Sequence, residues 1–219
     1  MGDVRRRPHR PRRHPVTARI AVLISHIPIR EAERDRAVAS VDAQTRRPDT
    51  VLIRTDLDHE GSAVTRNHGL MSIMDYEETD FVAFLDDDDE FLPHHLDELV
   101  RCAIAHEADV VYPGCHVVGG HDPHDRFGQP FDADLLRQQS YIPVTSLVRM
   151  SKIEELFKVH GDAFWRPPGT DYDDWGFYLR LLDVGAKFIH HPVKTWLWHH
   201  WGYGMPGRPG NTSGMGHRW

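Results

Sequence analysis

The chain has 219 residues, of which 40% are hydrophobic and 27% are charged, a balance typical of one soluble globular domain. No apolar run approaches the roughly 20 residues that cross a bilayer, so we expect no transmembrane segment. The first 15 residues carry positive charges without a following apolar core, which argues against a secretory signal. Two cysteines, Cys102 and Cys115, make neither a disulfide framework nor a zinc site, and we expect a reducing, cytoplasmic compartment.

The formal net charge of −7 is unevenly distributed. Residues 1–19 hold seven arginines and one aspartate, which leaves 19 basic and 32 acidic residues, or −13, for the rest. We expect residues 1–16 to form a disordered, solvated basic arm. A basic arm could also touch nucleic acid, but the acidic remainder has no basic stripe to continue that contact. Nucleic acid is therefore not an expected partner.

Strands and helices are predicted to alternate through the first half of the chain. In chain order, we expect a strand at 18–26, a helix at 30–44, a strand at 48–56, a helix at 62–74, a strand at 80–87, a helix at 93–104 and a strand at 108–113. Gly69 weakens the prediction of the second helix because glycine disfavours a helix interior. Such alternation argues for a single α/β domain with a mixed, mostly parallel sheet flanked by helices.

The second half is predicted to be less regular. In chain order, we expect a long loop at 114–132, a strand at 141–150, a short helix from 151, a helix at 171–188, strands at 187–200 and a flexible tail at 202–219. Ser151 and Glu154 have the spacing of a capping box at the start of the short helix. Gly185 is placed to end the longer one.

Five consecutive acidic residues, Asp86 to Glu90, follow the apolar run of the third strand. Ligands of open α/β sheets bind beyond the carboxyl ends of strands, and Mg²⁺ and Mn²⁺ prefer oxygen ligands. Asp86 and Asp88 could therefore both turn toward a divalent ion where the backbone bends. The alternative is that Asp89 and Glu90 only favour the N-terminus of the helix that Pro93 opens.

Four segments, in the right order, resemble family 2 glycosyltransferases, which have the GT-A fold. FVAFLDDDDEFLPHHL (81–96) is similar to the segment with the family's DxD motif, where a pattern close to LDxDDxxxPxxL recurs. SVDAQTRRPDTVLI (40–53) is similar to the first helix and second strand, and TRNHGL (65–70) to the ARNxG segment. DDWGFYLRL (173–181) resembles the acidic catalytic motif. The resemblance covers roughly residues 17–201 and implies a GT-A, Rossmann-like fold.

The resemblance implies a metal site for Mn²⁺ or Mg²⁺, with Asp88 as the main ligand. Asp86 would contact the ribose or the water shell of the ion, and Asp87 would belong to the nucleotide-sugar site. Several relatives place a metal-binding histidine after the last core strand, where this chain has His199 and His200. Adjacent strand residues point to opposite faces, so only one of the two is expected to face the ion, and we choose His200.

Further nucleotide-sugar contacts are expected from Pro28, Arg66 and Asp173, and from Asp56 with Asp58 as its alternative. Arg66 would reach the uracil or the diphosphate, because its fork of donors suits anionic oxygens. The alternative for Arg66 is a structural ion pair.

Asp174 is the expected general base, by the match to an acidic residue followed by Asp, five residues and Arg-Leu. A single displacement on the face opposite the diphosphate would invert the anomeric configuration. The alternative is that Asp171, Asp173 and Asp174 are first-turn residues favoured by the helix dipole. We expect residues 17–115 to form the nucleotide-sugar half of the domain and residues 116–201 the acceptor-binding and catalytic half.

The predicted function is that of a metal-dependent, inverting glycosyltransferase of the hexosyltransferase type. It would move a sugar from a nucleotide-diphosphate sugar, with a UDP-sugar favoured, to a hydroxyl-bearing acceptor: a saccharide, a lipid, a protein or a nucleobase. One alternative is a sugar-nucleotide hydrolase or nucleotidyltransferase that uses the same metal site. The absence of a Gly-rich phosphate loop after the first strand argues against the nucleotidyltransferase. The other alternative is a non-catalytic protein that binds nucleic acid through its basic arm.

Overall fold

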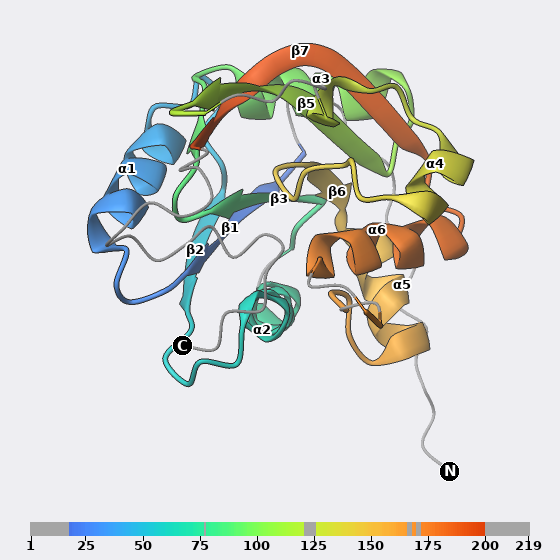
Figure 1. Ribbon diagram of the computed structural model, residues 1–219, viewed down its shortest axis with the longest axis horizontal. Coiled ribbons are helices and arrows are strands. Elements are labelled where there is room, and N and C mark those ends of the chain that lie inside the picture. Colours follow the sequence, from blue (N-terminus) through green and yellow to red (C-terminus); the bar gives the residue numbers. More distant parts are fainter. Residues whose placement is uncertain (1–17, 77, 121–125, 166–167, 170–171, 200–219) are drawn as a thin grey trace.

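The computed structural model describes residues 18–76, 78–120, 126–165, 168–169 and 172–199, in which one seven-stranded sheet lies between two layers of helices (Figure 1). The strands are β1 (Ile20–His26), β2 (Thr50–Thr55), β3 (Phe81–Asp86), β4 (Glu90–Phe91), β5 (Val110–Val118), β6 (Leu147–Arg149) and β7 (Phe188–His199). The helices are α1 (Glu31–Asp42), α2 (Ser62–Tyr76), α3 (His95–Ala105), α4 (Ala133–Gln138), α5 (Met150–His160) and α6 (Asp173–Asp183), with a 3₁₀ turn η2 (Arg126–Gly128). The expected arm at 1–16 and tail at 202–219 lie outside the described residues.

The sheet has the strand order β2-β1-β3-β6-β5-β7-β4 and is mixed. β1 pairs in parallel with β2 and β3, and β5 pairs in parallel with β7. The short strand β6 runs antiparallel to both β3 and β5 and so joins the two parallel groups, while β4 runs antiparallel to β7. The predicted α/β class, with a mixed sheet flanked by helices, is confirmed.

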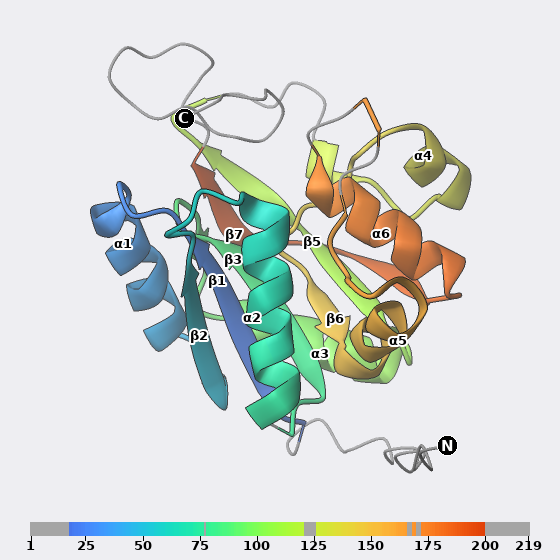
Figure 2. The ribbon, with the colours of Figure 1, turned by 90° about the horizontal axis from the view of Figure 1, so that it is seen from below.

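Each face of the sheet buries its own apolar cluster. α2, α5 and α6 cover one face, onto which Figure 2 looks, and α1 and α3 cover the other. Leu70 and Phe177 belong to the first cluster and Val41 to the second. Along β1, Leu23 joins the first cluster and its neighbour Val22 the second, because successive strand residues point to opposite faces. Burial on both faces explains why β1 has no polar alternation.

Helix α2 continues through Gly69, and at that residue the helix packs very close to β1. A Cβ atom on Gly69 would lie 2.5 Å from Cδ1 of Leu23, a distance that real Cβ atoms do not tolerate. The glycine therefore costs helix propensity but permits the close approach of α2 to the sheet.

Several elements of the second half differ from the prediction. β5 runs on to Val118, inside the segment expected to be a loop, because it stays paired with β7 up to His199. The strand expected at 141–150 is reduced to β6. The six-residue helix α4 was not predicted, and neither was the two-residue strand β4 of the first half.

The predicted capping box at Ser151 is wrong. Helix α5 begins at Met150 with Arg149 at the N-cap position, so Ser151 already lies in the first turn. β6 ends at Arg149, so this strand leads directly into α5. The backbone N–H of Met150 donates to the carbonyl of Asp80, just before β3, at 2.9 Å. Gly185, in contrast, ends α6 as predicted, with a φ of 69°.

No helix in the described part of the chain combines the length and the apolar composition that a membrane crossing needs.

Candidate active site

The acidic run lies where two neighbouring parallel strands end. Ser25 of β1 is paired in register with Asp86 of β3, and its hydroxyl donates to Asp86 Oδ1 at 3.1 Å. The loop after β1 and the run after β3 therefore leave the sheet side by side. This edge is where open α/β sheets bind their ligands.

Three carboxylates of the run form a compact group of oxygens. Asp86, Asp88 and Asp89 each offer one oxygen, and these oxygens lie within 4.8 Å of one another. A set of hard oxygen donors fits Mg²⁺ or Mn²⁺. The sequence suggested for Asp89 only the alternative role at the start of the following helix. In a run of identical aspartates, the sequence alone does not show which side chains come together.

The alternative role of Asp89 and Glu90 as caps of α3 is not what the structure shows. Glu90 belongs to β4 and Asp89 precedes it, whereas α3 begins only at His95, and its N-cap residue His94 makes no side-chain capping bond. Asp89 Oδ1 accepts from the backbone N–H of His199 at 3.0 Å. The His199 ring Nε2 lies 2.7 Å from Glu90 Oε1, so this histidine is engaged by the run itself. His200, the predicted metal ligand, lies outside the described residues.

Three arginines compensate the acidic run. Arg30 Nη1 donates to Asp87 at 3.1 Å and to Asp88 at 2.7 Å. Arg66 Nη2 donates to Asp86 at 2.5 Å. The third, Arg36, donates to the main-chain carbonyl of Asp88 at 3.1 Å and forms an ion pair of 2.9 Å with the carboxylate of Glu90. Arg30 and Arg36 were missed because their pairing depends on the adjacency of β1 and β3, which the sequence does not specify.

Asp87 holds the loop after β1. Its Oδ2 accepts from the backbone N–H of Ile27 at 2.9 Å and lies 2.9 Å from His26 Nδ1, while Oδ1 accepts from Arg30. Pro28 is exposed at the tip of the same loop. The contacts of Asp87 in the structure are thus to protein groups that shape the loop carrying Pro28.

The carboxylates of the run are costly to ionise together. Burial is the main cause that raises the pKa of Asp88 to about 7, with Asp86 and Asp87 acting in the same direction and Arg30 opposing them. Burial, together with Asp88 and Asp86, raises the pKa of Asp89 well above its usual range. A divalent ion bound here would displace protons, as metal binding to carboxylates does.

Arg66 joins the strand-end carboxylates to the start of α6. Its Nη1 donates to Asp173 Oδ2 at 2.7 Å while Nη2 holds Asp86, and Ser62 Oγ donates to the same Asp173 oxygen at 2.9 Å. The guanidinium lies 5.3 Å from the ring centre of Phe164. Burial alone would lower the pKa of Arg66, but Asp86 and Asp173 raise it above its usual value. The structure thus contains the ion pair that was the alternative role of Arg66.

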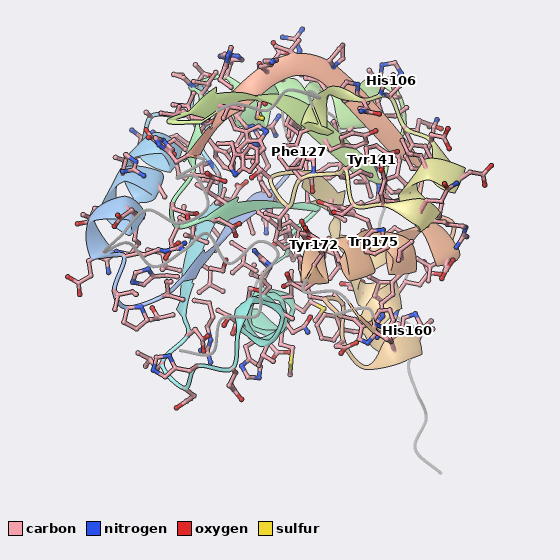
Figure 3. The ribbon with its side chains drawn as sticks, in the orientation of Figure 1. His106, Phe127, Tyr141, His160, Tyr172 and Trp175 are labelled. Atoms are coloured by element: carbon pink, nitrogen blue, oxygen red, sulfur yellow. The ribbon has the colours of Figure 1, made fainter. Side chains whose placement is uncertain are left out.

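Asp174 lies beside this chain of ion pairs, in the first turn of α6. Its Oδ1 accepts from the backbone N–H of Trp175 at 2.8 Å, and the indole of Trp175 donates to the carbonyl of Leu136 in α4 at 2.7 Å. Figure 3 shows Trp175 and Tyr172 at this end of α6. Burial raises the pKa of Asp174 to about 7, Asp173 adds to the rise and Arg66 opposes it. Such a pKa suits a group that accepts a proton near neutral pH.

Asp56 follows β2, and its backbone N–H donates to the carbonyl of His26 at the end of β1 at 2.8 Å. Its two oxygens accept from the backbone N–H groups of Glu60 at 2.9 Å and Gly61 at 2.8 Å, so it shapes the turn that leads into α2. Asp58 is exposed in the same turn, and Asp171 lies outside the described residues. The structure therefore brings together Asp86, Asp88 and Asp173 of the predicted site, with Asp174 next to them in the chain.

Residues 30–167 match the family described as glycosyl transferase family 2, a span that stops short of Asp173 and Asp174. No curated protein matches the sequence.

Among solved structures, the chain is similar to S. aureus TarS, with 15% identity, a TM-score of 0.63 and coverage of 83% of this chain and 36% of that one. It is similar at 15% identity and a TM-score of 0.64 to TarS 1-349 in complex with UDP-GlcNAc and with UDP, covering 83% of this chain and 58% and 60% of those chains. The chain thus spans less than two thirds of each of these structures. The likeness confirms the predicted GT-A fold.

Proposed function

The chain belongs to glycosyl transferase family 2, and from this premise we propose that it is a metal-dependent, inverting glycosyltransferase. It moves a sugar from a nucleotide-diphosphate sugar to the hydroxyl group of an acceptor. The observation that carries the proposal is the continuous chain of contacts from the strand-end carboxylates through Arg66 to Asp173, the neighbour of Asp174. This chain of contacts supports one site in which the strand-end carboxylates would bind a cation and Asp174 would accept a proton.

Asp86, Asp88 and Asp89 would hold the divalent ion, Mn²⁺ or Mg²⁺, and His200 is a further proposed ligand. When bound, the ion neutralises the negative charge that develops on the leaving diphosphate, as a Lewis acid. The protein prepares this site by keeping Asp86 fixed between Ser25 and Arg66. Preorganised ligands of this kind cost no reorganisation during the reaction.

Asp174 would act as the general base. The acceptor oxygen forms a bond to the anomeric carbon while the bond from that carbon to the diphosphate oxygen breaks. The acceptor proton passes to Asp174, and the electron pair leaves with the diphosphate. We also propose that Asp174 faces the sugar on the side opposite the diphosphate, which would give inversion. Asp173 keeps its neighbour in place through Arg66 and Ser62.

A UDP-sugar is the favoured donor, and the complex of TarS with UDP-GlcNAc supports this proposal. Pro28 and Asp56 would border the nucleotide, and Asp87 would act on it through the loop that carries Pro28. We further propose that residues 17–115 form the donor half of the domain and residues 116–201 the acceptor half. The position of Asp86 in the first and of Asp174 in the second supports that division.

Substitution of Asp88 by Asn tests the proposal. The variant keeps the size of the side chain but loses the charge that a divalent ion requires. We expect transfer to fall by about 10³-fold or more, the scale of a lost electrostatic interaction at the transition state. Transfer is measured with UDP-sugars, Mn²⁺ and a panel of hydroxyl acceptors, and free sugar is measured in parallel so that hydrolysis is separated from transfer.

Asp97→Asn is the matched control, because Asp97 is an exposed acid of α3 whose partner is Arg101. It should transfer at the wild-type rate. Full activity in Asp88→Asn, or equal rates of sugar release with and without every acceptor in the panel, contradicts the proposed function.

A further inference from the structure

Arg30 is fixed at the junction between β1 and α1. Its backbone N–H donates to the carbonyl of Ile27 at 3.0 Å, which closes the turn after β1. Its own carbonyl accepts from the N–H of Arg34 at 2.9 Å, the first bond of α1. The main chain on both sides is therefore tied down, and the guanidinium can only reach groups close to this junction.

The guanidinium of Arg30 is buried among the carboxylates of the acidic run. Its Nη1 is shared between Asp87 Oδ1, at 3.1 Å, and Asp88 Oδ2, at 2.7 Å. Only 10% of the Arg30 side chain is exposed. A buried guanidinium in such a place acts as a counter-ion for both carboxylates.

The two contacts of Arg30 differ in how easily they can change. Asp87 also accepts from the backbone of Ile27 and contacts His26, so it belongs to the frame of the loop. In the described part of the chain, Arg30 is the one side chain that bonds to the Asp88 carboxylate. The Arg30–Asp88 contact is thus the one that a ligand of Asp88 would replace.

Asp88 also belongs to the group of three oxygens that fits a divalent ion. Without a diphosphate, an ion bound to Asp88 must share this carboxylate with the buried guanidinium of Arg30. Two cations so close in a low-dielectric site repel each other. A diphosphate changes this balance, because its oxygens can accept from the guanidinium and also bind the ion. The metal and the diphosphate together suit the site better than the metal alone.

We propose that Arg30 is an internal counter-ion of Asp88 that makes binding of the divalent ion depend on the nucleoside diphosphate. Arg30 is then a positioning and specificity residue: it favours the complex of metal and diphosphate over the free ion. This inference rests on the proposed function, since it assumes that Asp88 is a metal ligand.

The test measures Mn²⁺ binding by electron paramagnetic resonance, with and without UDP, in the wild type and in Arg30→Gln. Without UDP, Arg30→Gln should bind Mn²⁺ about tenfold more tightly than the wild type, and UDP should then improve its Mn²⁺ affinity by a correspondingly smaller factor. By linkage, Mn²⁺ should also improve its UDP affinity less. A merely structural role of Arg30 would instead weaken both affinities.

Arg34→Gln is the matched control, because Arg34 lies one helical turn further along α1 and its guanidinium donates to the exposed carboxylate of Asp35. Its Mn²⁺ affinity should stay within about twofold of the wild type, as screened surface charges allow. A folded Arg30→Gln that binds Mn²⁺ no more tightly than the wild type overturns the inference. An equal gain in Arg34→Gln overturns it as well.

Two further measurements keep the test decisive. If Arg30→Gln does not fold, the crystal structure of the wild type with Mg²⁺ and UDP decides: the inference expects Arg30 to have left Asp88 for a phosphate oxygen, and a retained contact overturns it. Asp88→Asn separates the two proposals. If the wild type binds no Mn²⁺ even with UDP, the proposed function fails; if Asp88→Asn abolishes binding but Arg30→Gln does not alter it, only the role of Arg30 fails.

Discussion

The strand-end run, Asp86 to Glu90, and the helix-start pair, Asp173 and Asp174, solve the same electrostatic problem in different ways. The run is compensated by three arginines that reach it from the β1–α1 junction, α1 and α2. The pair shares only Arg66, whose bond goes to Asp173. In the described part of the chain, no basic side chain bonds to Asp174, whereas Asp88 bonds to Arg30, although burial raises the pKa of both carboxyls to about 7.

This difference supports the proposed separate tasks of the two regions. Carboxylates that hold an ion together with a diphosphate benefit from being kept in place before both arrive, and arginine partners provide that order. A carboxylate that takes a proton needs a pKa near the working pH, which a direct arginine partner would lower. Arg66 connects the two regions, so it allows the position of one to depend on that of the other.

The largest effect is expected from Asp174→Asn, which removes the proposed proton acceptor and leaves the strand-end run intact. Transfer should fall by about 10³-fold, within the usual range for loss of a general base. Binding of UDP with Mn²⁺, measured by calorimetry, should remain within about threefold of the wild type because the removed interaction belongs to the chemical step.

Asp183→Asn, at the other end of α6, is the control for this variant, since Asp183 is exposed and pairs with Arg137. It should not change the rate. A strong loss of UDP binding in Asp174→Asn would show that the two regions do not have separate tasks.

Arg66→Met should break the connection between the regions. Removing one partner of a buried ion pair leaves unpaired charge, and we expect the free energy of unfolding to fall by about 3–5 kcal/mol. Below the unfolding temperature, transfer should fall by about 100-fold, because misplacement of the reacting groups has effects of this size. Urea unfolding and initial rates measure the two quantities.

Arg149→Met is the comparison, since Arg149 pairs with Asp109 across β5 and β6, away from the acidic run. It should lower stability by about 1–2 kcal/mol and leave the transfer rate of the folded protein unchanged. An equal loss of transfer in both variants would mean that Arg66 acts only through stability.

The pH dependence of transfer should report Asp174. Its pKa lies above that of an ordinary carboxyl, so the reactive carboxylate forms only as the pH rises through about 7. At saturating Mn²⁺ and donor, the rate should therefore fall about tenfold from pH 8 to pH 6, the behaviour of a single group with this pKa. The residual transfer of Asp174→Asn should lack this step. A rate that is flat between pH 6 and pH 8 would exclude Asp174 as the titrating base.

Most of the first half of the fold was predictable from the sequence because its strands and helices are long enough to show their period. The elements at 18–26, 62–74 and 80–87 correspond to β1, α2 and β3. The second half was harder, because α4 is too short for any periodic pattern and the extension of β5 depends on its pairing with β7. In the first half, the two-residue strand β4 was missed for the same reason of length.

The candidate site was predictable where a motif carries it and not where distant segments meet. The run from Asp86 was predicted from its place at a strand end, and the pair at Asp173 from its resemblance to a family motif. The partners Arg30 and Arg36 were not predicted, because Arg30 and Asp88 are 58 positions apart and come together only through the order of strands in the sheet. The sequence likewise does not reveal that Gly69 marks a close packing contact.

The smallest effect is expected from Gly69→Ala, which moves α2, the helix that carries Arg66, relative to β1. The added methyl group would meet Leu23, and overpacking usually costs about 1–3 kcal/mol. Replacing a helical glycine recovers about 0.5–1 kcal/mol, so the net loss of stability should be near 1 kcal/mol.

A double-mutant cycle with Leu23→Val identifies the cause of this loss. Valine shortens the side chain that the new methyl group meets, so Gly69→Ala should cost less stability in the Leu23→Val background than in the wild type. Transfer should fall about threefold in Gly69→Ala, because a small shift of α2 displaces Arg66 from its two carboxylates, and Leu23→Val should restore part of the rate. If the cost of Gly69→Ala is the same in both backgrounds, the contact with Leu23 is not what requires glycine at this position.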